Sequence, residues 1–320
     1  MRAYVRQTGF GILQLTALTC ARLAQHPQFD QPPYRLRVDA DHVEVYATVT
    51  DCQSDFITGL ERENFKIFED KVPQEIAYLS SEDVPVTVGI IFDVSGSMKD
   101  KLPTAVRAAI TFMKNGNRDD KYFLLEFSDR PIETADLTSD IAKIQGRLLF
   151  SKAKGKTALY DAVYDGLRKL DEGSHARRAL LLITDGEDNS SRHTFSNVKE
   201  FVRERDIPLY AIGLSNGWVD MSVEEGRALL RKLSALSGGN SFFPPDVSGL
   251  ENICRLIALE LKHQYVIGYY STNTNKDGTW RKIKVSAEYQ KEKLTVRAKA
   301  GYYADPVDAP RDFPRPALPR

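Results

Sequence analysis

Two kinds of hydrophobic pattern divide the chain. Four short segments, 86–92, 122–127, 179–184 and 208–213, are almost continuously apolar, as is typical of strands buried on both faces of a parallel sheet. Apolar residues at helical spacing separate and follow them. Strand alternating with helix predicts an α/β fold with a doubly wound, mostly parallel sheet. The predicted helices span 104–114, 139–149, 158–170, 196–205, 223–237 and 247–262.

The segments on either side of this region alternate apolar and polar residues instead. This alternation predicts antiparallel strands with one buried face. Because it occurs both before and after the α/β region, we predict one small β-domain built from both flanks, with the α/β domain inserted between them. The predicted strands lie in 34–38, 43–49, 65–71, 265–269, 283–287 and 294–298. The predicted boundaries are a signal or leader segment at 1–33, the β-domain at 34–82 and 264–304, the α/β domain at 83–263, and a disordered proline-rich tail at 305–320.

Composition narrows the classes of partner and of metal. The 320 residues contain 44 basic and 44 acidic side chains without a basic run, so we expect neither a nucleic-acid partner nor a membrane-surface partner. We also expect no transmembrane segment. Three cysteines fit neither a disulfide framework nor a zinc site. Cys254 lies on an apolar helical stripe, which predicts a buried free thiol, and Cys52 lies in a predicted loop; a bridge between the two is the alternative.

The N-terminus has the order of a weak secretory signal. Arg2 and Arg6 precede an apolar stretch at residues 10–20, as in a signal peptide. Arg22 disrupts the best cleavage site, and Cys20 lacks the correctly placed leucine of a lipoprotein signal. We therefore expect a secreted or periplasmic protein, with an incorrectly assigned start as the alternative.

Oxygen-bearing side chains follow the ends of two predicted strands. Asp93, Ser95 and Ser97 come directly after one apolar run, and Asp185 follows another. Thr157 begins a predicted helix. Ligands of α/β sheets bind at the carboxyl ends of strands, and hard oxygens suit Mg²⁺, Mn²⁺ or Ca²⁺. The alternative is that these residues only form turns and helix caps.

In their order and spacing, the segments 93–97, 155–162 and 179–186 resemble the metal-ion-dependent adhesion site of von Willebrand factor A domains, over about residues 84–263. The flanks are similar to those of bacterial secreted proteins that contain this domain. The resemblance implies that three hydroxyls bind Mg²⁺, or Mn²⁺ or Ca²⁺, directly, and that two carboxylates bind it directly or through water. The implied ligands are Asp93, Ser95, Ser97, Thr157 and Asp185.

The resemblance implies a non-enzymatic adhesion or interaction module, in which the cation bridges to an acidic residue of an unknown protein partner. A second hypothesis is a structural or assembly component of the cell envelope that binds through its β-domain, with Tyr269, Tyr270, Tyr302 and Tyr303 as candidate contacts. A metal-dependent hydrolase is less well supported. Phe150 stands where a phosphate-binding loop needs glycine.

Overall fold

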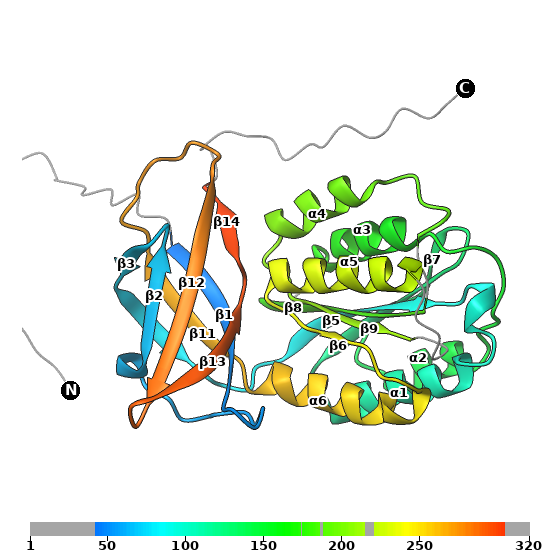
Figure 1. The fold of residues 1–320 in the computed structure, drawn as a ribbon. Helices are drawn as coiled ribbons and strands as arrows, with labels where there is room; N and C mark the ends of the chain where they lie inside the picture. Colours follow the sequence, from blue (N-terminus) through cyan, green and yellow to red (C-terminus); the bar gives the residue numbers. More distant parts are fainter. Residues whose placement is uncertain (1–41, 174, 186–187, 215–220, 305–320) are drawn as a thin grey trace, which may run out of the picture. The chain divides into compact units, whose positions relative to one another are not determined.

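The computed structural model describes residues 42–173, 175–185, 188–214 and 221–304. They lie within one compact unit, Asp39–Arg320. Their strands form a six-stranded mixed sheet and a separate eight-stranded antiparallel sheet (Figure 1). The predicted strand at 34–38, the leader at 1–33 and the tail at 305–320 lie outside the described residues.

The six-stranded sheet confirms the α/β prediction in the form of a mixed sheet. The strand order is β10-β9-β8-β5-β6-β7. All neighbours are parallel except β7, which runs antiparallel to β6 at one edge. Neither β7 nor the short β10 was predicted. The strands are β5 (Val86–Asp93), β6 (Lys121–Phe127), β7 (Pro131–Thr138), β8 (Arg177–Thr184), β9 (Leu209–Gly213) and β10 (Ser241–Phe242).

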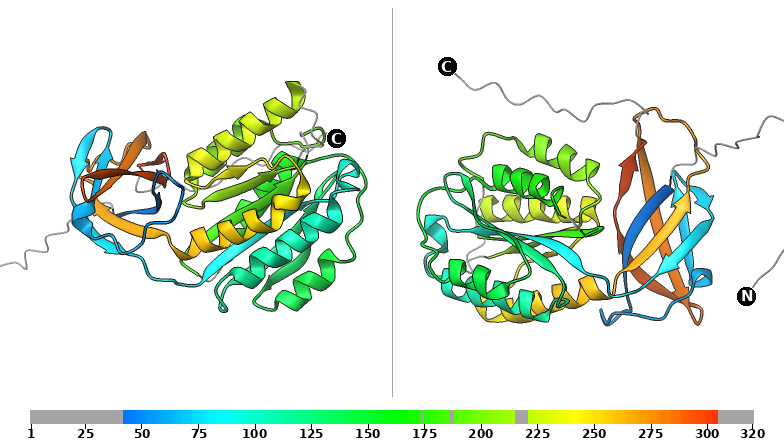
Figure 2. Two further views of the ribbon diagram at one scale, coloured as in Figure 1. Left: turned by 60° about the horizontal axis from the view of Figure 1, so that its bottom comes forward. Right: turned by 180° about the vertical axis from the view of Figure 1, so that it is seen from behind.

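Three helices cover each face of this sheet (Figure 2). One face packs against α1 (Leu102–Asn115), α2 (Ile141–Leu148) and α6 (Leu250–Lys262). The other packs against α3 (Leu159–Leu170), α4 (Phe195–Glu204) and α5 (Met221–Ser237). All six helices were predicted, with ends displaced by a few residues, because each carries an apolar stripe at helical spacing.

The eight-stranded sheet combines both flanks of the chain. The order is β3-β2-β12-β13-β1-β11-β4, and β14 also pairs with β12. Apolar residues from both flanks, including Val45 and Ile267, which are register partners, form one buried cluster. The chain leaves this sheet from β4 and returns in its neighbour β11, with Ser80 opposite Val266. The strands are β1 (His42–Thr50), β2 (Phe65–Glu69), β3 (Val72–Gln74), β4 (Ile76–Ser80), β11 (Tyr265–Tyr270), β12 (Trp280–Tyr289), β13 (Glu292–Ala298) and β14 (Gly301–Tyr303).

Most of the tyrosines expected on the surface of this sheet take part in polar contacts instead. The hydroxyls of Tyr269 and Tyr302 donate to the buried carboxylate of Glu69 at 2.8 and 2.9 Å. Tyr303 donates to Glu200 of α4 at 2.7 Å. Tyr270 is the member of the group that is largely exposed. Alternation along a strand cannot reveal the partner on another strand. Burial excludes Tyr269 from the proposed tyrosine contact surface, whereas Tyr302 and Tyr303 are half-buried.

The cysteines agree with the predicted free thiols. Cys254 is buried and Cys52 is exposed, and both are unbridged. Burial in the core raises the pKa of the Cys254 thiol to about 12. Within the part of the chain that the structure describes, no helix is long and apolar enough to cross a membrane.

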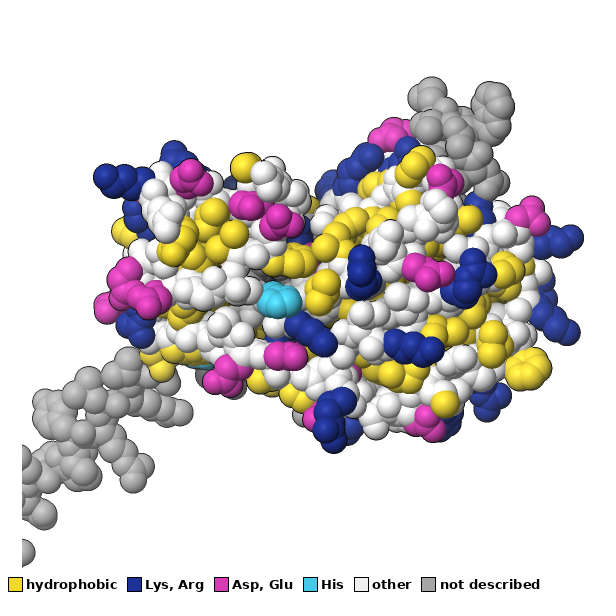
Figure 3. Space-filling view, turned by 90° about the horizontal axis from the view of Figure 1, so that it is seen from below, with side chains coloured by type: hydrophobic (Ala, Val, Ile, Leu, Met, Phe, Trp, Pro, Cys, Tyr) yellow, Lys and Arg dark blue, Asp and Glu magenta, His cyan; other side chains and the backbone are white. Residues whose placement is uncertain are grey.

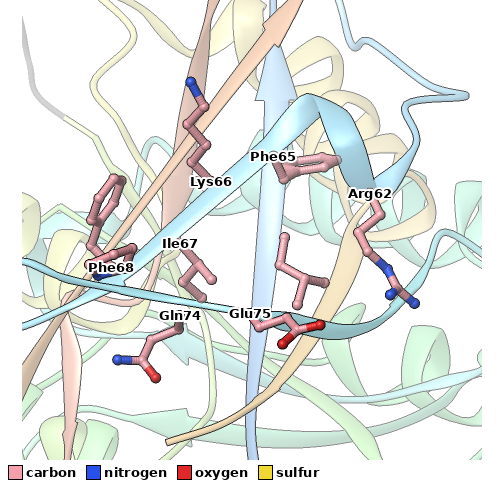
Figure 4. A pocket seen from close by; sticks show the side chains of 9 residues that line it. Arg62, Phe65, Lys66, Ile67, Phe68, Gln74 and Glu75 are labelled. Atoms are coloured by element: carbon pink, nitrogen blue, oxygen red, sulfur yellow. The ribbon is translucent and has the colours of Figure 1, made fainter. Parts of the chain in front are cut away.

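The polar side chains that line a pocket in the eight-stranded sheet do not converge on one point. The pocket holds about 250 Å³ and is lined by residues of β2 and β3, by the first residue of β4, and by Arg62 and Glu75 beside these strands. Figure 4 shows Lys66 pointing away from Gln74 and Glu75, so the polar side chains do not converge. Charges of both signs are interspersed with apolar side chains on the face in Figure 3, which agrees with the balanced composition.

Candidate functional site

Two carboxylates lie at one edge of the six-stranded sheet. Asp93 is the last residue of β5, and Asp185 directly follows β8. These strands are parallel neighbours, with Phe92 opposite Ile183. Strands β5 and β8 therefore end side by side at the carboxyl edge of the sheet. This edge is the position at which α/β sheets bind ligands.

A chain of hydrogen bonds joins four of the five predicted residues. The Ser95 N–H donates to Asp93 Oδ1 at 2.7 Å. The hydroxyl oxygens of Ser95 and Ser97 are 3.1 Å apart, and the Ser97 hydroxyl donates to Asp185 Oδ1 at 2.8 Å. The turn between the serines is a 3₁₀ segment, Gly96–Met98. The serine turn and the end of β8 thus bring two carboxylates and two hydroxyls into one run of hydrogen bonds.

The loop that precedes Thr157 reaches the same region through its backbone. The Gly96 N–H donates to the Gly155 carbonyl at 3.0 Å, which ties the loop before Thr157 to the serine turn. Thr157 is buried, and its N–H donates to Asn189 Oδ1 at 2.8 Å. The N-cap residue of α3 is Ala158, which makes no side-chain cap. The structure therefore does not use Thr157 as the helix cap that the alternative interpretation proposed.

Gly155 allows this loop to turn. Its φ of +81° lies in the left-handed region, which favours glycine. A Cβ at this position would lie 2.7 Å from a carboxylate oxygen of Asp129. That carboxylate also accepts the Lys156 N–H at 2.8 Å. The glycine is thus required both by the backbone conformation and by the close approach of Asp129.

The environment of Asp93 disfavours its negative charge. The side chain is buried, and Oδ2 accepts the Thr184 hydroxyl at 2.6 Å. Burial raises the pKa of Asp93 to about 6, although the hydrogen bonds from Thr184 and Ser95 lower it. A buried carboxylate of this kind gains stability from a nearby cation.

Lys101 provides a positive charge that the sequence analysis missed. Its ammonium forms an ion pair with Asp185, and the two side chains are only 8% and 1% exposed. Lys101 is the N-cap residue of α1, whose first turn contains no acidic residue. A cation at this end of a helix is unfavourable. That unusual position is the signal that the sequence offers for Lys101.

The donor set fits a hard divalent cation. Carboxylate and hydroxyl oxygens are ligands suited to Mg²⁺, and the Lys101 ammonium already acts as a stand-in cation against Asp185. Among the described residues, no group of three or more His, Cys, Asp or Glu side chains forms a metal cluster. The two carboxylates therefore need the hydroxyls of Ser95, Ser97 and Thr157 to complete a site.

An exposed loop connects α2 to this site. We call residues 149–156 the rim loop. Leu149 and Phe150 are 63% and 83% exposed, and the Lys154 N–H donates to the Val94 carbonyl at 2.8 Å beside Asp93. Its lysines form none of the ion pairs found among the described residues, and their side chains are exposed. They are Lys152, Lys154 and Lys156.

Comparison with known proteins found a family model that matches the region holding this site. Residues 88–187 match the family described as von Willebrand factor type A domain. A putative VWFA domain-containing protein, ORF892, of Acidianus two-tailed virus is 28% identical over 137 residues, which cover 40% of this chain and 15% of the viral protein. The chain thus spans a small part of that relative's length.

Solved structures resemble the fold. A von Willebrand factor type A protein from Catenulispora acidiphila aligns over 83% of this chain and 74% of its own, with 14% identity and a TM-score of 0.50. The protein BatB from Bacteroides thetaiotaomicron aligns over 55% of this chain and 97% of its own, with 20% identity and a TM-score of 0.46. At these identities the likeness concerns the fold alone.

Proposed function

We propose that the von Willebrand factor type A domain that this chain contains binds a partner protein through a divalent cation. Domains of this type commonly take part in protein–protein interaction or adhesion. The proposed ligands are Asp93, Ser95, Ser97, Thr157 and Asp185. The observation that carries the proposal is the run of hydrogen bonds at the carboxyl edge of the sheet that links Asp93 through the Ser95 N–H, and the hydroxyls of Ser95 and Ser97, to Asp185.

Charge and ligand number favour binding over catalysis. Two carboxylates balance the charge of one divalent cation, and Mg²⁺ takes about six oxygen ligands. The five side chains can supply most of these oxygens, and a carboxylate from a partner can supply another. The hydroxyls and carboxylates around the proposed cation are hydrogen-bonded to one another. In this proposal they hold the cation, and the cation joins two proteins.

The rim loop suggests the chemistry of the partner. Phe150 and Leu149 present apolar surface, and three lysines lie along the same loop. Such a surface complements a segment in which acidic residues stand beside an apolar one. We therefore propose a partner whose metal-binding carboxylate lies next to an apolar side chain. The secreted or periplasmic location remains a prediction from the N-terminal sequence.

The experiment begins with the metal alone. Mg²⁺ and Mn²⁺ are titrated calorimetrically into the full chain, an Asp93→Ala variant and an Asp100→Ala variant. Asp100 is an exposed carboxylate near the serine turn, so it controls for loss of one negative charge. We expect binding by the wild type and Asp100→Ala and strongly reduced binding by Asp93→Ala, with circular dichroism confirming that the variants fold.

A second stage tests the bridge. Peptides that bind in Mg²⁺ are selected from a displayed library, and each Asp or Glu of a selected peptide is changed to Asn or Gln. We expect that one such change, or addition of a chelator, abolishes binding. Equal metal affinity in Asp93→Ala would overturn the ligand assignment, whereas peptide binding that survives both chelation and every carboxylate change would overturn the bridge.

A further inference from the structure

We propose that Lys101 is a built-in competitor for the divalent cation. Its ammonium neutralises Asp185 when the site holds no metal, and a divalent cation binds Asp185 by displacing it. This inference rests on the proposed metal site, and it concerns how that site accepts the ion. It follows from the position of Lys101, its burial and the charge of its neighbours.

The position of the ammonium is maintained by Asp185. Lys101 is buried, although burial of a lysine is costly without a paired charge. It also lies at the N-terminal end of α1, where the helix dipole repels a cation. Within the described residues, the ammonium has Asp185 as its hydrogen-bond partner. The ion pair with Asp185 therefore compensates for two unfavourable features of the same side chain.

The charge balance of the site allows either the Lys101 ammonium or the divalent cation to contact Asp185, but not both. Asp93 and Asp185 together carry at most two negative charges, which one divalent cation neutralises. With the ammonium still in contact with Asp185, the site would hold three positive charges against two negative ones. Because both carboxylates are buried, solvent screens this excess poorly. The ammonium must therefore withdraw as the metal enters.

The backbone allows the side chain alone to make this change. The Lys101 N–H donates to the Met98 carbonyl at 2.9 Å, and its own carbonyl accepts from Ala105 at 3.0 Å. These bonds fix the main chain at the start of α1. The four-carbon stem of lysine is flexible, so the ammonium can move away from Asp185 while the helix stays in place. Metal binding then requires no rearrangement of the serine turn.

The experiment compares metal affinities in matched variants of the full chain. Lys101→Met removes the charge and keeps a side chain of similar length. Lys101→Arg keeps the charge, and Lys99→Met removes a nearby exposed lysine. Mg²⁺ and Mn²⁺ are titrated calorimetrically into each. We expect Lys101→Met to bind both ions at least about tenfold more tightly than the wild type, because an opposing cation has been removed. Lys99→Met and Lys101→Arg should gain no such affinity.

Thermal unfolding gives a second readout. In a chelator, Lys101→Met leaves Asp185 without its cation and should unfold at a lower temperature than Lys99→Met. Addition of Mg²⁺ should raise its unfolding temperature by more than it raises that of the wild type. Equal or weaker metal affinity in Lys101→Met, with a folded protein, would overturn the competitor role.

The outcomes separate this inference from the proposed function. If the wild type binds metal and Lys101→Met binds no better, the metal site stands and the competitor role fails. If only Lys101→Met binds metal, the competitor role stands and the wild-type domain does not use a metal bridge. If no variant binds, both fail. Peptide binding that survives chelation and is lost in Lys101→Met would make Lys101 itself the partner's contact and overturn the inference.

Discussion

Two buried ion pairs in the molecule differ in how firmly their partners are held. In the eight-stranded sheet, Arg281 lies 3.4 Å from Glu69, and the two side chains are 1% and 2% exposed. Both come from strands. The Glu69 carboxylate also accepts three hydroxyls, and Arg281 also donates to two backbone carbonyls. These partners are Tyr269, Ser271 and Tyr302 for Glu69, and Asn273 and Asn275 for Arg281.

Among the residues that the structure describes, the ion pair at the candidate site has fewer additional hydrogen bonds. Asp185 follows the end of β8 and accepts the Ser97 hydroxyl, and the described contacts of the Lys101 ammonium are with Asp185. A charge pair embedded in a full network specifies one arrangement of the chain, whereas a pair with few other bonds can exchange one partner. The comparison teaches that burial alone does not separate a structural ion pair from an exchangeable one. The number of additional hydrogen bonds does.

The largest expected loss of stability follows from breaking the Arg281–Glu69 ion pair. Glu69→Ala leaves the Arg281 guanidinium buried without its carboxylate, and loss of one partner of a buried pair costs about 3–5 kcal/mol. We expect the free energy of unfolding, measured in urea, to fall by that amount. The exposed Glu75 provides the control as Glu75→Ala. A loss below about 1 kcal/mol, as for a surface pair, would show that Glu69 does not hold the network together.

Breaking the Lys101–Asp185 ion pair should cause a smaller loss of stability, which Mg²⁺ reverses. In a chelator, Lys101→Met should lose about 1–3 kcal/mol of the free energy of unfolding, less than Glu69→Ala, because the Asp185 carboxylate keeps the Ser97 hydroxyl as a partner. Saturating Mg²⁺ should restore most of it. The stability of Glu69→Ala should respond to Mg²⁺ only as much as that of the wild type. If Mg²⁺ rescued both variants equally, the contrast between the two pairs would be wrong.

A change on the rim loop should affect binding without affecting either pair. Phe150→Ser removes an exposed ring, so the free energy of unfolding should change by less than about 0.5 kcal/mol. Affinity for a peptide selected in Mg²⁺ should fall about tenfold, as for a contact worth more than 1 kcal/mol. Leu256→Ala, at an exposed position of α6, is the control. Unchanged peptide affinity in Phe150→Ser would remove the rim loop from the proposed interface.

The smallest effect concerns a buried group that has no charged partner. Burial raises the pKa of Cys254 to about 12, above the ordinary thiol value of about 8.5, so little thiolate forms between pH 7 and 9. In a Cys20→Ser background, iodoacetamide should label the exposed Cys52 and leave Cys254 unlabelled over this pH range, as followed by mass spectrometry. Urea should make both react. Labelling of Cys254 in the native protein would show that α6 opens readily.

The sequence patterns predicted the parts of the fold that obey a regular period. Strands such as β5 and β8 are continuous apolar runs, and the helices carry clear stripes. The edge strand β7 was missed because its residues, Pro-Ile-Glu-Thr-Ala-Asp-Leu-Thr, are mostly polar or exposed. An edge strand has one paired side and needs little apolar surface, so periodicity does not identify it.

The same limit applies to the candidate site. Asp93 and Asp185 could be predicted to lie together because each follows a buried strand of a parallel sheet. Nothing periodic marks Lys101, and its role depends on Asp185, which is far away in sequence. Glu69 poses the same difficulty in the β region, because its hydroxyl partners lie on strands of the other flank. Long-range polar contacts are therefore what the sequence analysis missed in both regions.

The strand order of the eight-stranded sheet governs when its parts can fold. Strand β1 pairs with β11 and β13, and β4 pairs with β11, so the N-terminal strands are synthesised long before these partners exist. In the unfolded chain, joining β4 to β11 means closing a loop of residues 81–264, at an entropic cost that grows with loop length. Folding of the α/β region removes much of that cost, because β5 and α6, which follow β4 and precede β11, share one core. Strands β1 and β4 are thus made early and paired late, whereas β2 and β3 can pair with each other as soon as both are made.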